Sequence, residues 1–267
     1  RISRLTLRRR RRSMPHLTIE GHRLYYEWLG GYDPARPTAV FLHDGLGAIR
    51  SWRAVPERIG AAAGLNALAY DRWGYGRSDP REEFPYGFME AEMPALRGLL
   101  DALGIERASL IGHSDGGSIA LLLAARHPER VTALVTEAAH TFIEPQTQAA
   151  IGGLLQAQAA GRTPEWIARL HGERGERLLA AWAASWIDPE HAGWQIEDWL
   201  GYITAPTLVI QGDGDDFGTL AQVRSIMNRI GGAEQWIVPD CGHTPHTEVE
   251  DAFVERVAEF LGRHVAD

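Results

Sequence analysis

Short apolar runs alternate with segments of helical periodicity along most of the chain. Runs with the length and character of buried strands occupy residues 38–43, 66–70, 108–112, 131–136, 206–211 and 235–238. Between them, apolar side chains recur every three or four positions in residues 51–63, 90–103, 115–126, 219–230 and 246–264, which predicts helices. This alternation indicates an α/β fold with a parallel or mostly parallel sheet that helices cover on both faces.

Two stretches depart from the alternation. Residues 16–20 and 23–29 are strand-like and are separated by Gly21 and His22, which predicts a hairpin. Residues 141–202 contain no strand-like run, are broken at several glycines and prolines, and hold five of the nine tryptophans. We therefore expect a core built from residues 14–140 and 203–267, with residues 141–202 inserted between two strands as a helical cap.

Composition and charge exclude several classes of protein. The chain has 267 residues, of which 45% are hydrophobic and 23% charged, as is typical of globular proteins. No stretch approaches the roughly 20 apolar residues of a membrane span. Residues 1–13 carry seven arginines and no acid, and we expect a disordered leader there, ahead of a natural start at Met14. The remainder is more acidic than the formal net charge of −8 implies, which argues against nucleic-acid binding.

Cysteine usage points to a reducing compartment. Cys241 is the only cysteine, so no intramolecular disulfide can form. Because side chains close together in sequence rarely point at one another, we expect Cys241 to pack rather than to act as a nucleophile with His243. No Cys/His spacing suggests a zinc site. We predict a soluble, cytoplasmic protein without a bound metal.

A glycine-rich turn joins the strand at 108–112 to the helix at 115–126. It reads GHSDGG over residues 112–117 and fits the G-x-S-x-G pattern of a nucleophile elbow. In such an elbow a strained strand-to-helix turn lifts the serine hydroxyl clear of the backbone. An ordinary glycine turn is the alternative, but the strand and helix on either side favour Ser114 as a nucleophile.

A serine hydroxyl attacks only when a base takes its proton and a carboxylate orients that base. His243 follows the strand at 235–238, and Asp213, Asp215 and Asp216 follow the strand at 206–211. Loops after the carboxyl ends of strands are where open α/β sheets carry their active sites. Along the chain these candidates come in the order serine, acid, histidine, which is the order that accompanies a G-x-S-x-G nucleophile elbow.

Several segments together resemble the α/β-hydrolase family, specifically its bacterial esterase-like and C–C-hydrolase-like branches. They are FLHDGLGAIRSW, YDRWGYGRSD, GHSDGG, PTLVIQGDGDD and CGHTPH, and the resemblance covers nearly everything from His16 onward. It implies a mainly parallel eight-stranded sheet with a helical cap and no cofactor. In the family the acid usually lies three residues after the glycine that closes its strand, which selects Asp215 and leaves Asp216 and Asp213 as substitutes.

The resemblance also implies an oxyanion hole of two backbone amides. One donor is the amide of Asp115, the residue after the nucleophile. The other is Gly45, by its match to the family's His-Gly-x pattern. The chain departs from that pattern at Asp44, which stands in place of a glycine, and an acid at position 115 is also unusual.

Further residues are candidates for the substrate pocket. For His113 and for His246, a hydrogen-bonded structural role is favoured over a catalytic one. Tryptophans in a segment such as 141–202 more often pack in a hydrophobic core than contact a substrate. If they do form an aromatic lid over the site, a substrate with an apolar or aromatic acyl group is favoured. The pocket candidates are Asp44, Leu46, His113, Trp182 and Trp186.

We predict hydrolysis of a carboxylic ester, or of a similar small acyl substrate, through an acyl-enzyme. Ser114 attacks, His243 transfers the proton and Asp215 orients His243. The alternatives on the same triad are C–C bond hydrolysis of a vinylogous diketone and lactone opening. A haloalkane dehalogenase or epoxide hydrolase is disfavoured because those relatives place an aspartate where Ser114 stands. A non-catalytic ligand-binding protein of the same fold is the alternative from another class.

Overall fold

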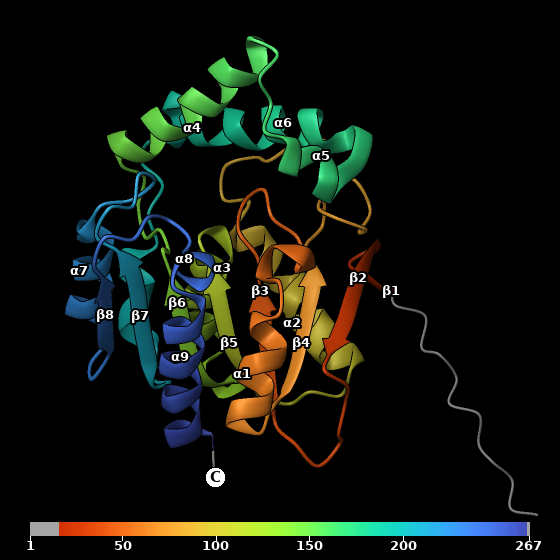
Figure 1. Cartoon of the computed structure of the whole chain (residues 1–267), viewed down its shortest axis with the longest axis vertical. Coiled ribbons are helices and arrows are strands. Elements are labelled where there is room, and N and C mark those ends of the chain that lie inside the picture. Colours follow the sequence, from red (N-terminus) through yellow and green to blue (C-terminus); the bar gives the residue numbers. More distant parts are fainter. Residues whose placement is uncertain (1–15, 266–267) are drawn as a thin grey trace, which may run out of the picture.

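Eight strands form one mixed sheet at the centre of the molecule (Figure 1), in a computed structural model that describes residues 16–265. Their order across the sheet is β1-β2-β4-β3-β5-β6-β7-β8. The hairpin β1–β2 joins β4 in antiparallel fashion, and every other neighbouring pair is parallel. This confirms the predicted sheet, whereas the predicted leader lies outside the described residues. The strands are β1 (His16–Ile19), β2 (His22–Leu29), β3 (Thr38–Leu42), β4 (Asn66–Asp71), β5 (Ala108–His113), β6 (Val131–Glu137), β7 (Thr207–Gly212) and β8 (Glu234–Val238).

Helices cover both faces of the sheet. Val40 and Leu42 of β3 face one apolar layer, and Ala39 and Phe41 face the other, as the alternation of side chains along a strand requires. Since neither face meets water, β3, β5 and β7 are buried along their whole lengths, which explains their continuous apolar sequences. One layer contains α1 (Val55–Ala63) and α9 (Glu250–His264), and the other contains α2 (Met93–Ala102), α3 (Asp115–Arg126) and α7 (Leu220–Arg229).

Some helices begin or break at positions that periodicity does not reveal. The expected helix at 51–63 starts as α1 only at Val55, after a separate 3₁₀ turn, with Pro56 in its first turn. The expected helix at 246–264 is divided at Val249 into α8 (Pro245–Glu248) and α9. The Glu248 carboxylate accepts hydrogen bonds from the amides of Gly242 and Thr244, which ties α8 to the preceding loop.

Residues 141–202 form helices between β6 and β7, and α4, α5 and α6 lie above the carboxyl ends of the strands (Figure 1). The segment contains no strand, and its only β-type pairing within the described residues is an isolated bridge between Phe142 and Gln195. Its helices are α4 (Pro145–Ala159), α5 (Glu165–His171) and α6 (Gly175–Ile187). The 3₁₀ turns in the part of the chain that the structure describes are Ile49–Trp52, Glu90–Glu92, Pro128–Arg130, Gly172–Arg174, Pro189–His191 and Glu197–Tyr202.

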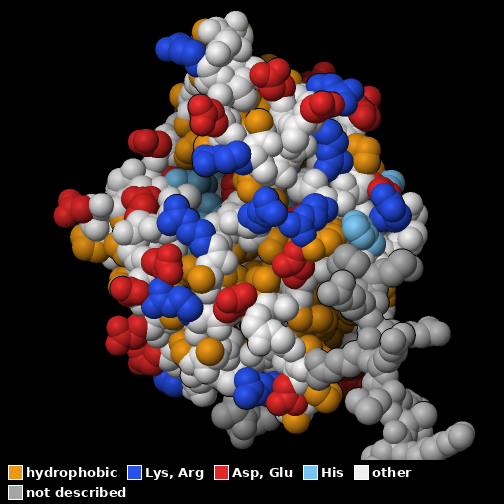
Figure 2. All heavy atoms as spheres, turned by 45° about the vertical axis from the view of Figure 1, so that its right-hand side comes forward, with side chains coloured by type: hydrophobic (Ala, Val, Ile, Leu, Met, Phe, Trp, Pro, Cys, Tyr) orange, Lys and Arg blue, Asp and Glu red, His pale blue; other side chains and the backbone are white. Residues whose placement is uncertain are grey.

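The surface carries charges of both signs. On the face shown in Figure 2, arginine and acidic side chains are interspersed rather than separated into two patches. Within residues 16–265, every helix is too short or too polar to cross a membrane.

Candidate active site

The register of the parallel strands brings the loops of the predicted site to one edge of the sheet. Gly112 of β5 pairs with Leu42 of β3, and His113 pairs with Glu137 of β6. On the other side of β6, the carboxyl ends of β7 and β8 are in register with each other. The loops after β3, β5, β7 and β8 therefore meet, and they carry Asp44, Ser114, Asp215 and His243.

Ser114 has a backbone conformation that residues with a side chain rarely adopt, with φ 53° and ψ −121°. The glycines around it allow the strand and the helix to approach closely. A Cβ atom on Gly112 would overlap the carbonyl group of Gly116, and one on Gly116 would overlap the carbonyl oxygen of Leu42. The GHSDGG segment thus forms a strained strand-to-helix turn, and Ser114 stands at its tip.

Asp215 is the carboxylate that contacts His243. The Nδ1 atom of His243 lies 2.9 and 3.0 Å from the two carboxylate oxygens of Asp215. The Asp215 side chain is 1% exposed and also accepts a hydrogen bond from the Phe217 amide. Asp213 and Asp216 are both exposed. The geometry therefore distinguishes Asp215 from the two neighbours that the sequence left as substitutes.

The His243–Asp215 contact changes the proton affinity of both groups. Burial by itself lowers the pKa of His243, but the hydrogen bond to Asp215 and its negative charge outweigh burial and raise the pKa. Burial would likewise raise the pKa of Asp215, yet the same contact holds it below its usual value. The pair thus stabilises an imidazolium at His243, the state that a base reaches after taking a proton.

Ser114 and His243 open into a common cavity of about 370 Å³. Among the described residues, the Ser114 hydroxyl makes no hydrogen bond to His243, a contact that is often long without substrate and shortens when substrate binds. The cavity is lined by Asp44, Gly45, Leu46, His113, Ser114, Leu154, Trp166, Trp182, Phe217, His243 and Thr244.

Sequence reasoning identified this lining in part. Trp186, predicted to line the pocket, instead lies beside a separate small hollow with Met89 and Trp194, and its ring packs edge-on against His140. The reason is its position on α6, one helical turn beyond Trp182, where its ring contacts His140 and Trp194. Four lining residues were missed, although Trp166 is one of the five tryptophans of the inserted segment, Phe217 lies two residues after Asp215 and Thr244 follows His243. The four are Leu154, Trp166, Phe217 and Thr244.

Of the two predicted oxyanion donors, Gly45 lines this cavity, and Asp115 directly follows Ser114 at the start of α3. Asp115 is the first residue of α3, so its amide has no partner within the helix. Gly45 lines the cavity, and a Cβ atom there would collide with the indole of Trp182. The loop after β3 and helix α6 therefore approach each other closely at Gly45.

The side chain of Asp115 belongs to a buried network rather than to the cavity wall. Its carboxylate accepts a hydrogen bond from Trp182 Nε1 at 2.9 Å and lies 3.5 Å from Arg72. Burial raises the pKa of Asp115 to about 6, against the opposing effects of Arg72 and Trp182. Arg72 also pairs with Glu92 at 3.0 Å, so buried charges of opposite sign lie together beneath the Ser114 turn.

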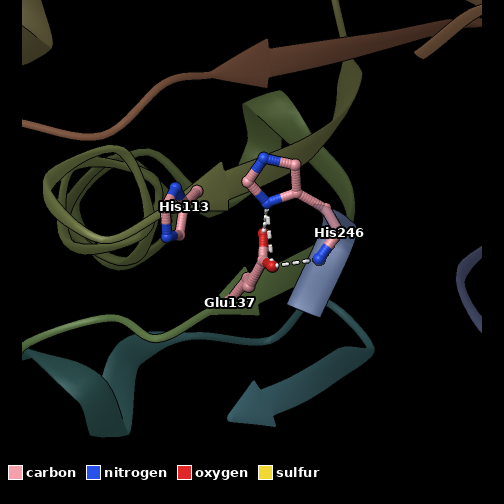
Figure 3. Close-up of side chains that lie close together, drawn as sticks. All are labelled: His113, Glu137 and His246. Carbon is pink, nitrogen blue, oxygen red and sulfur yellow. Dashed lines mark hydrogen bonds and ion pairs between the residues drawn. The ribbon is translucent and has the colours of Figure 1, made fainter. Parts of the chain in front are cut away.

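A second group of buried titratable side chains consists of His113, Glu137 and His246, which lie close together (Figure 3). His113 Nε2 donates a hydrogen bond to the backbone carbonyl of His243 at 2.9 Å. Glu137 accepts hydrogen bonds from the amide and from Nδ1 of His246, the latter at 2.8 Å. Burial opposes both charges, but their attraction raises the pKa of His246 and lowers that of Glu137.

Histidine and glutamate also ligate metals, and the ligand atoms of these three residues lie within 4.8 Å of one another. Both oxygens of Glu137 are already hydrogen-bonded to His246, however, so the group is satisfied internally as an ion pair. Nearby, burial first and Glu248 second raise the pKa of the Cys241 thiol to about 12, which leaves it a poor nucleophile.

Helix α5 is fastened to the loops on the sheet. His171 Nε2 donates to the carbonyl of Leu46 at 2.7 Å, and its Nδ1 accepts from the amide of Gly76 at 3.0 Å. Together with the Trp182–Asp115 bond on α6, this contact fixes the helical segment above the cavity.

Residues 38–193 match the family model described as the alpha/beta hydrolase fold. A 2-hydroxy-6-oxo-6-phenylhexa-2,4-dienoate hydrolase from Comamonas testosteroni is 29% identical over 83% of this chain and 86% of its own. The serine hydrolase BPHL of Mus musculus is 26% identical over 73% of this chain and 68% of its own. Among solved structures, the enol-lactonase from Burkholderia xenovorans superposes with a TM-score of 0.72 at 26% identity, covering 92% of this chain and 99% of that one.

Proposed function

The chain belongs to the α/β-hydrolase family, and from this premise we propose that it is a serine hydrolase that cleaves a carboxylic ester or a similar small acyl substrate. The observation that carries the proposal is the buried His243–Asp215 pair, which shares one cavity with the strained Ser114. The name of one relative, serine hydrolase BPHL, adds support for a serine nucleophile.

In the proposed reaction the Ser114 hydroxyl attacks the substrate carbonyl while His243 takes the hydroxyl proton. Asp215 holds the proton on Nδ1, so Nε2 is the nitrogen free to act as the base. The amides of Gly45 and Asp115 stabilise the oxyanion. His243 then gives its proton to the leaving group, an acyl-enzyme forms, and a water activated by His243 releases the acid and restores Ser114.

The helices over residues 141–202 act as a cap in this proposal. Leu154, Trp166 and Trp182 form the part of the cavity wall that this segment contributes. Their apolar surface limits the access of water to the acyl-enzyme and accommodates the acyl or aryl group of the substrate.

A second candidate is cleavage of a C–C bond or of a lactone by the same three residues. The similarity to a dienoate hydrolase and to an enol-lactonase favours it. In these reactions the bond to the attacked carbonyl carbon that breaks is a C–C bond or the C–O bond of a lactone ring, in place of the C–O bond of an open-chain ester, and His243 gives its proton to the carbon or oxygen that leaves. Supplying esters, lactones and vinylogous diketones to one preparation distinguishes them by their products.

Labelling and turnover together test the proposal. We expect a fluorophosphonate probe to label Ser114 and the protein to hydrolyse para-nitrophenyl esters with sustained turnover. Ser114→Ala should abolish labelling and lower kcat/KM by at least about a thousandfold, since the nucleophile has no substitute. Ser225→Ala, on the distant helix α7, is the matched control. Binding of substrates without labelling or turnover by the unmodified protein would instead indicate a ligand-binding protein.

A further inference from the structure

Asp44 places an unpaired carboxylate in the wall of the cavity. Its side chain is 23% exposed and lines the cavity with Ser114 and His243. Within residues 16–265, its carboxylate oxygens accept no hydrogen bond, and the imidazole of His113 is 3.9 Å away at Nδ1. Because His113 donates its Nε2 proton to the His243 carbonyl, a neutral His113 has no proton at Nδ1 to offer Asp44.

Within the described part of the chain, no permanently charged cation lies beside Asp44 in the cavity wall. The chain contains no lysine, and no arginine lines the cavity. Burial favours a neutral Asp44, but the positive charges that His113, His43 and His243 carry when protonated outweigh burial and lower the pKa of Asp44. Burial lowers the pKa of His113, whereas His243, which lines the same cavity, has a raised pKa to which the charge of Asp44 contributes. In the proposed reaction His243 must be neutral to take the Ser114 proton, and in that state it offers Asp44 no positive charge. The contrast with Asp115 is direct, because Asp115 has both Arg72 and Trp182 as partners.

Aromatic side chains line the same cavity as Asp44. Trp166, Trp182 and Phe217 contribute to its wall. Aromatic rings attract cations through the negative charge of their faces, and quaternary ammonium groups are often held by rings together with a carboxylate. The combination of an unpaired anion and several rings in one cavity is suited to a substituted ammonium group.

The position of Asp44 also bears on the chemistry. It directly precedes Gly45, the proposed oxyanion donor, and a negative charge there opposes the negative charge that develops on the substrate oxygen. A positive group on the substrate, lying near Asp44, offsets this repulsion. A carboxylate on the substrate would add to it.

We propose that Asp44 selects substrates that carry a positively charged ammonium group and disfavours substrates that carry a carboxylate. This inference rests on the proposed function, because it concerns the ester that Ser114 attacks. It separates this chain from the relative whose name specifies a dienoate, which is an anion. The substrate class is therefore a small ester with an alkylated or free amine.

Three para-nitrophenyl esters of matched length test the inference. Their acyl chains end in trimethylammonium, in the isosteric tert-butyl group and in carboxylate. We expect kcat/KM of the unmodified protein to decrease in that order, with about a tenfold advantage of the cation over the tert-butyl ester, which corresponds to about 1.4 kcal/mol. Asp44→Asn, which keeps the shape and removes the charge, should abolish that advantage, whereas Asp213→Asn, an exposed acid outside the cavity, should retain it.

The outcomes separate this inference from the proposed function. Labelling of Ser114 with equal turnover of the three esters, or with preference for the carboxylate, would overturn the role of Asp44 and leave the serine hydrolase standing. A cation preference that persists in Asp44→Asn would also overturn it. Failure of all esters together with absent labelling would count against the proposed function. If Asp44→Asn does not fold, competitive inhibition of the unmodified protein by tetramethylammonium, but not by tert-butanol, supports the inference, and equal inhibition contradicts it.

Discussion

Three aspartates follow β7 within four positions, and burial distinguishes them. Asp215 lies against His243, while Asp213 and Asp216 are exposed to solvent. A carboxylate that is hydrogen-bonded to an imidazole fixes its tautomer, and a solvated one nearby does not. The three aspartates therefore differ in where their side chains point, toward His243 or toward solvent, and not in chemical type.

Substitution of these acids gives a prediction at the residue scale. Asp215→Asn keeps the size of the side chain but favours the wrong tautomer of His243, and we expect kcat to fall by about 10⁴-fold on any ester the protein hydrolyses. Asp213→Asn and Asp216→Asn should each stay within about twofold. Steady-state kinetics of the three variants is the measurement. A large loss in Asp216→Asn with little loss in Asp215→Asn would show that the acid has been misassigned.

At the scale of elements, helix α6 is joined to helix α3 through the Trp182–Asp115 hydrogen bond. The bond connects the helical segment with the first turn of the helix that begins at Ser114. Because Asp115 is fully buried, loss of its indole donor leaves one carboxylate oxygen with Arg72 as its only remaining contact. Packing of the segment and electrostatics of the Ser114 turn are therefore coupled.

Trp182→Phe tests this coupling. We expect the free energy of unfolding to fall by about 1–3 kcal/mol, since the buried Asp115 carboxylate loses its shorter hydrogen bond and keeps only the 3.5 Å contact with Arg72. Trp166→Phe is the matched control, because Trp166 also lines the cavity but makes no hydrogen bond within the described residues. Urea denaturation followed by circular dichroism provides the comparison. Equal destabilisation by the two substitutions would show that the indole N–H contributes nothing specific.

At the scale of the whole molecule, the Glu137–His246 ion pair connects the C-terminal helices to the centre of the sheet. Glu137 ends β6, beside His113 at the end of β5, and His246 lies on α8. Both side chains are almost completely buried, at 0% and 3% exposure. Removal of one partner leaves an uncompensated charge in the interior, which is strongly destabilising.

Stability should therefore depend on pH through this pair. Because folding lowers the pKa of Glu137, the stability that its negative charge contributes is present above the ordinary glutamate pKa of 4.5. That stability is lost as pH falls through the lower pKa of Glu137 in the folded protein. Because folding raises the pKa of His246, the stability that its positive charge contributes is present below the ordinary histidine pKa of 6.5. That stability is lost as pH rises through the higher pKa of His246 in the folded protein. The pair stabilises the fold most between these two ordinary values.

We expect Glu137→Gln to lower the free energy of unfolding by about 3–5 kcal/mol in that window, with a smaller difference from the unmodified protein at higher and at lower pH. Glu259→Gln, an exposed glutamate of α9, should change it by less than about 0.5 kcal/mol at every pH. Urea denaturation across the pH range checks both. A difference that does not vary with pH would mean that the Glu137 charge has no part in it.

The sequence by itself determined the elements, their alternation and the sheet type, because burial on two faces requires continuous apolar strands and helices of regular period. It also determined the GHSDGG turn, since only glycines at positions 112 and 116 permit the close approach of strand and helix. The breaks near Val55 and Val249 escaped prediction because side-chain hydrogen bonds and local turns, and not periodicity, set them.

Only the tertiary structure decided which side chains meet. The register of β3, β5 and β6 and of β7 with β8 brings together residues up to about 200 positions apart in the chain, such as Asp44 and His243. The path of residues 141–202 over the sheet placed Trp182 in the cavity wall and Trp186 outside it. Direction and burial of a side chain depend on every element packed around it, so the position of Asp44 in the cavity wall, where its carboxylate accepts no hydrogen bond from the described residues, is a property of the fold and not of its neighbours in the sequence.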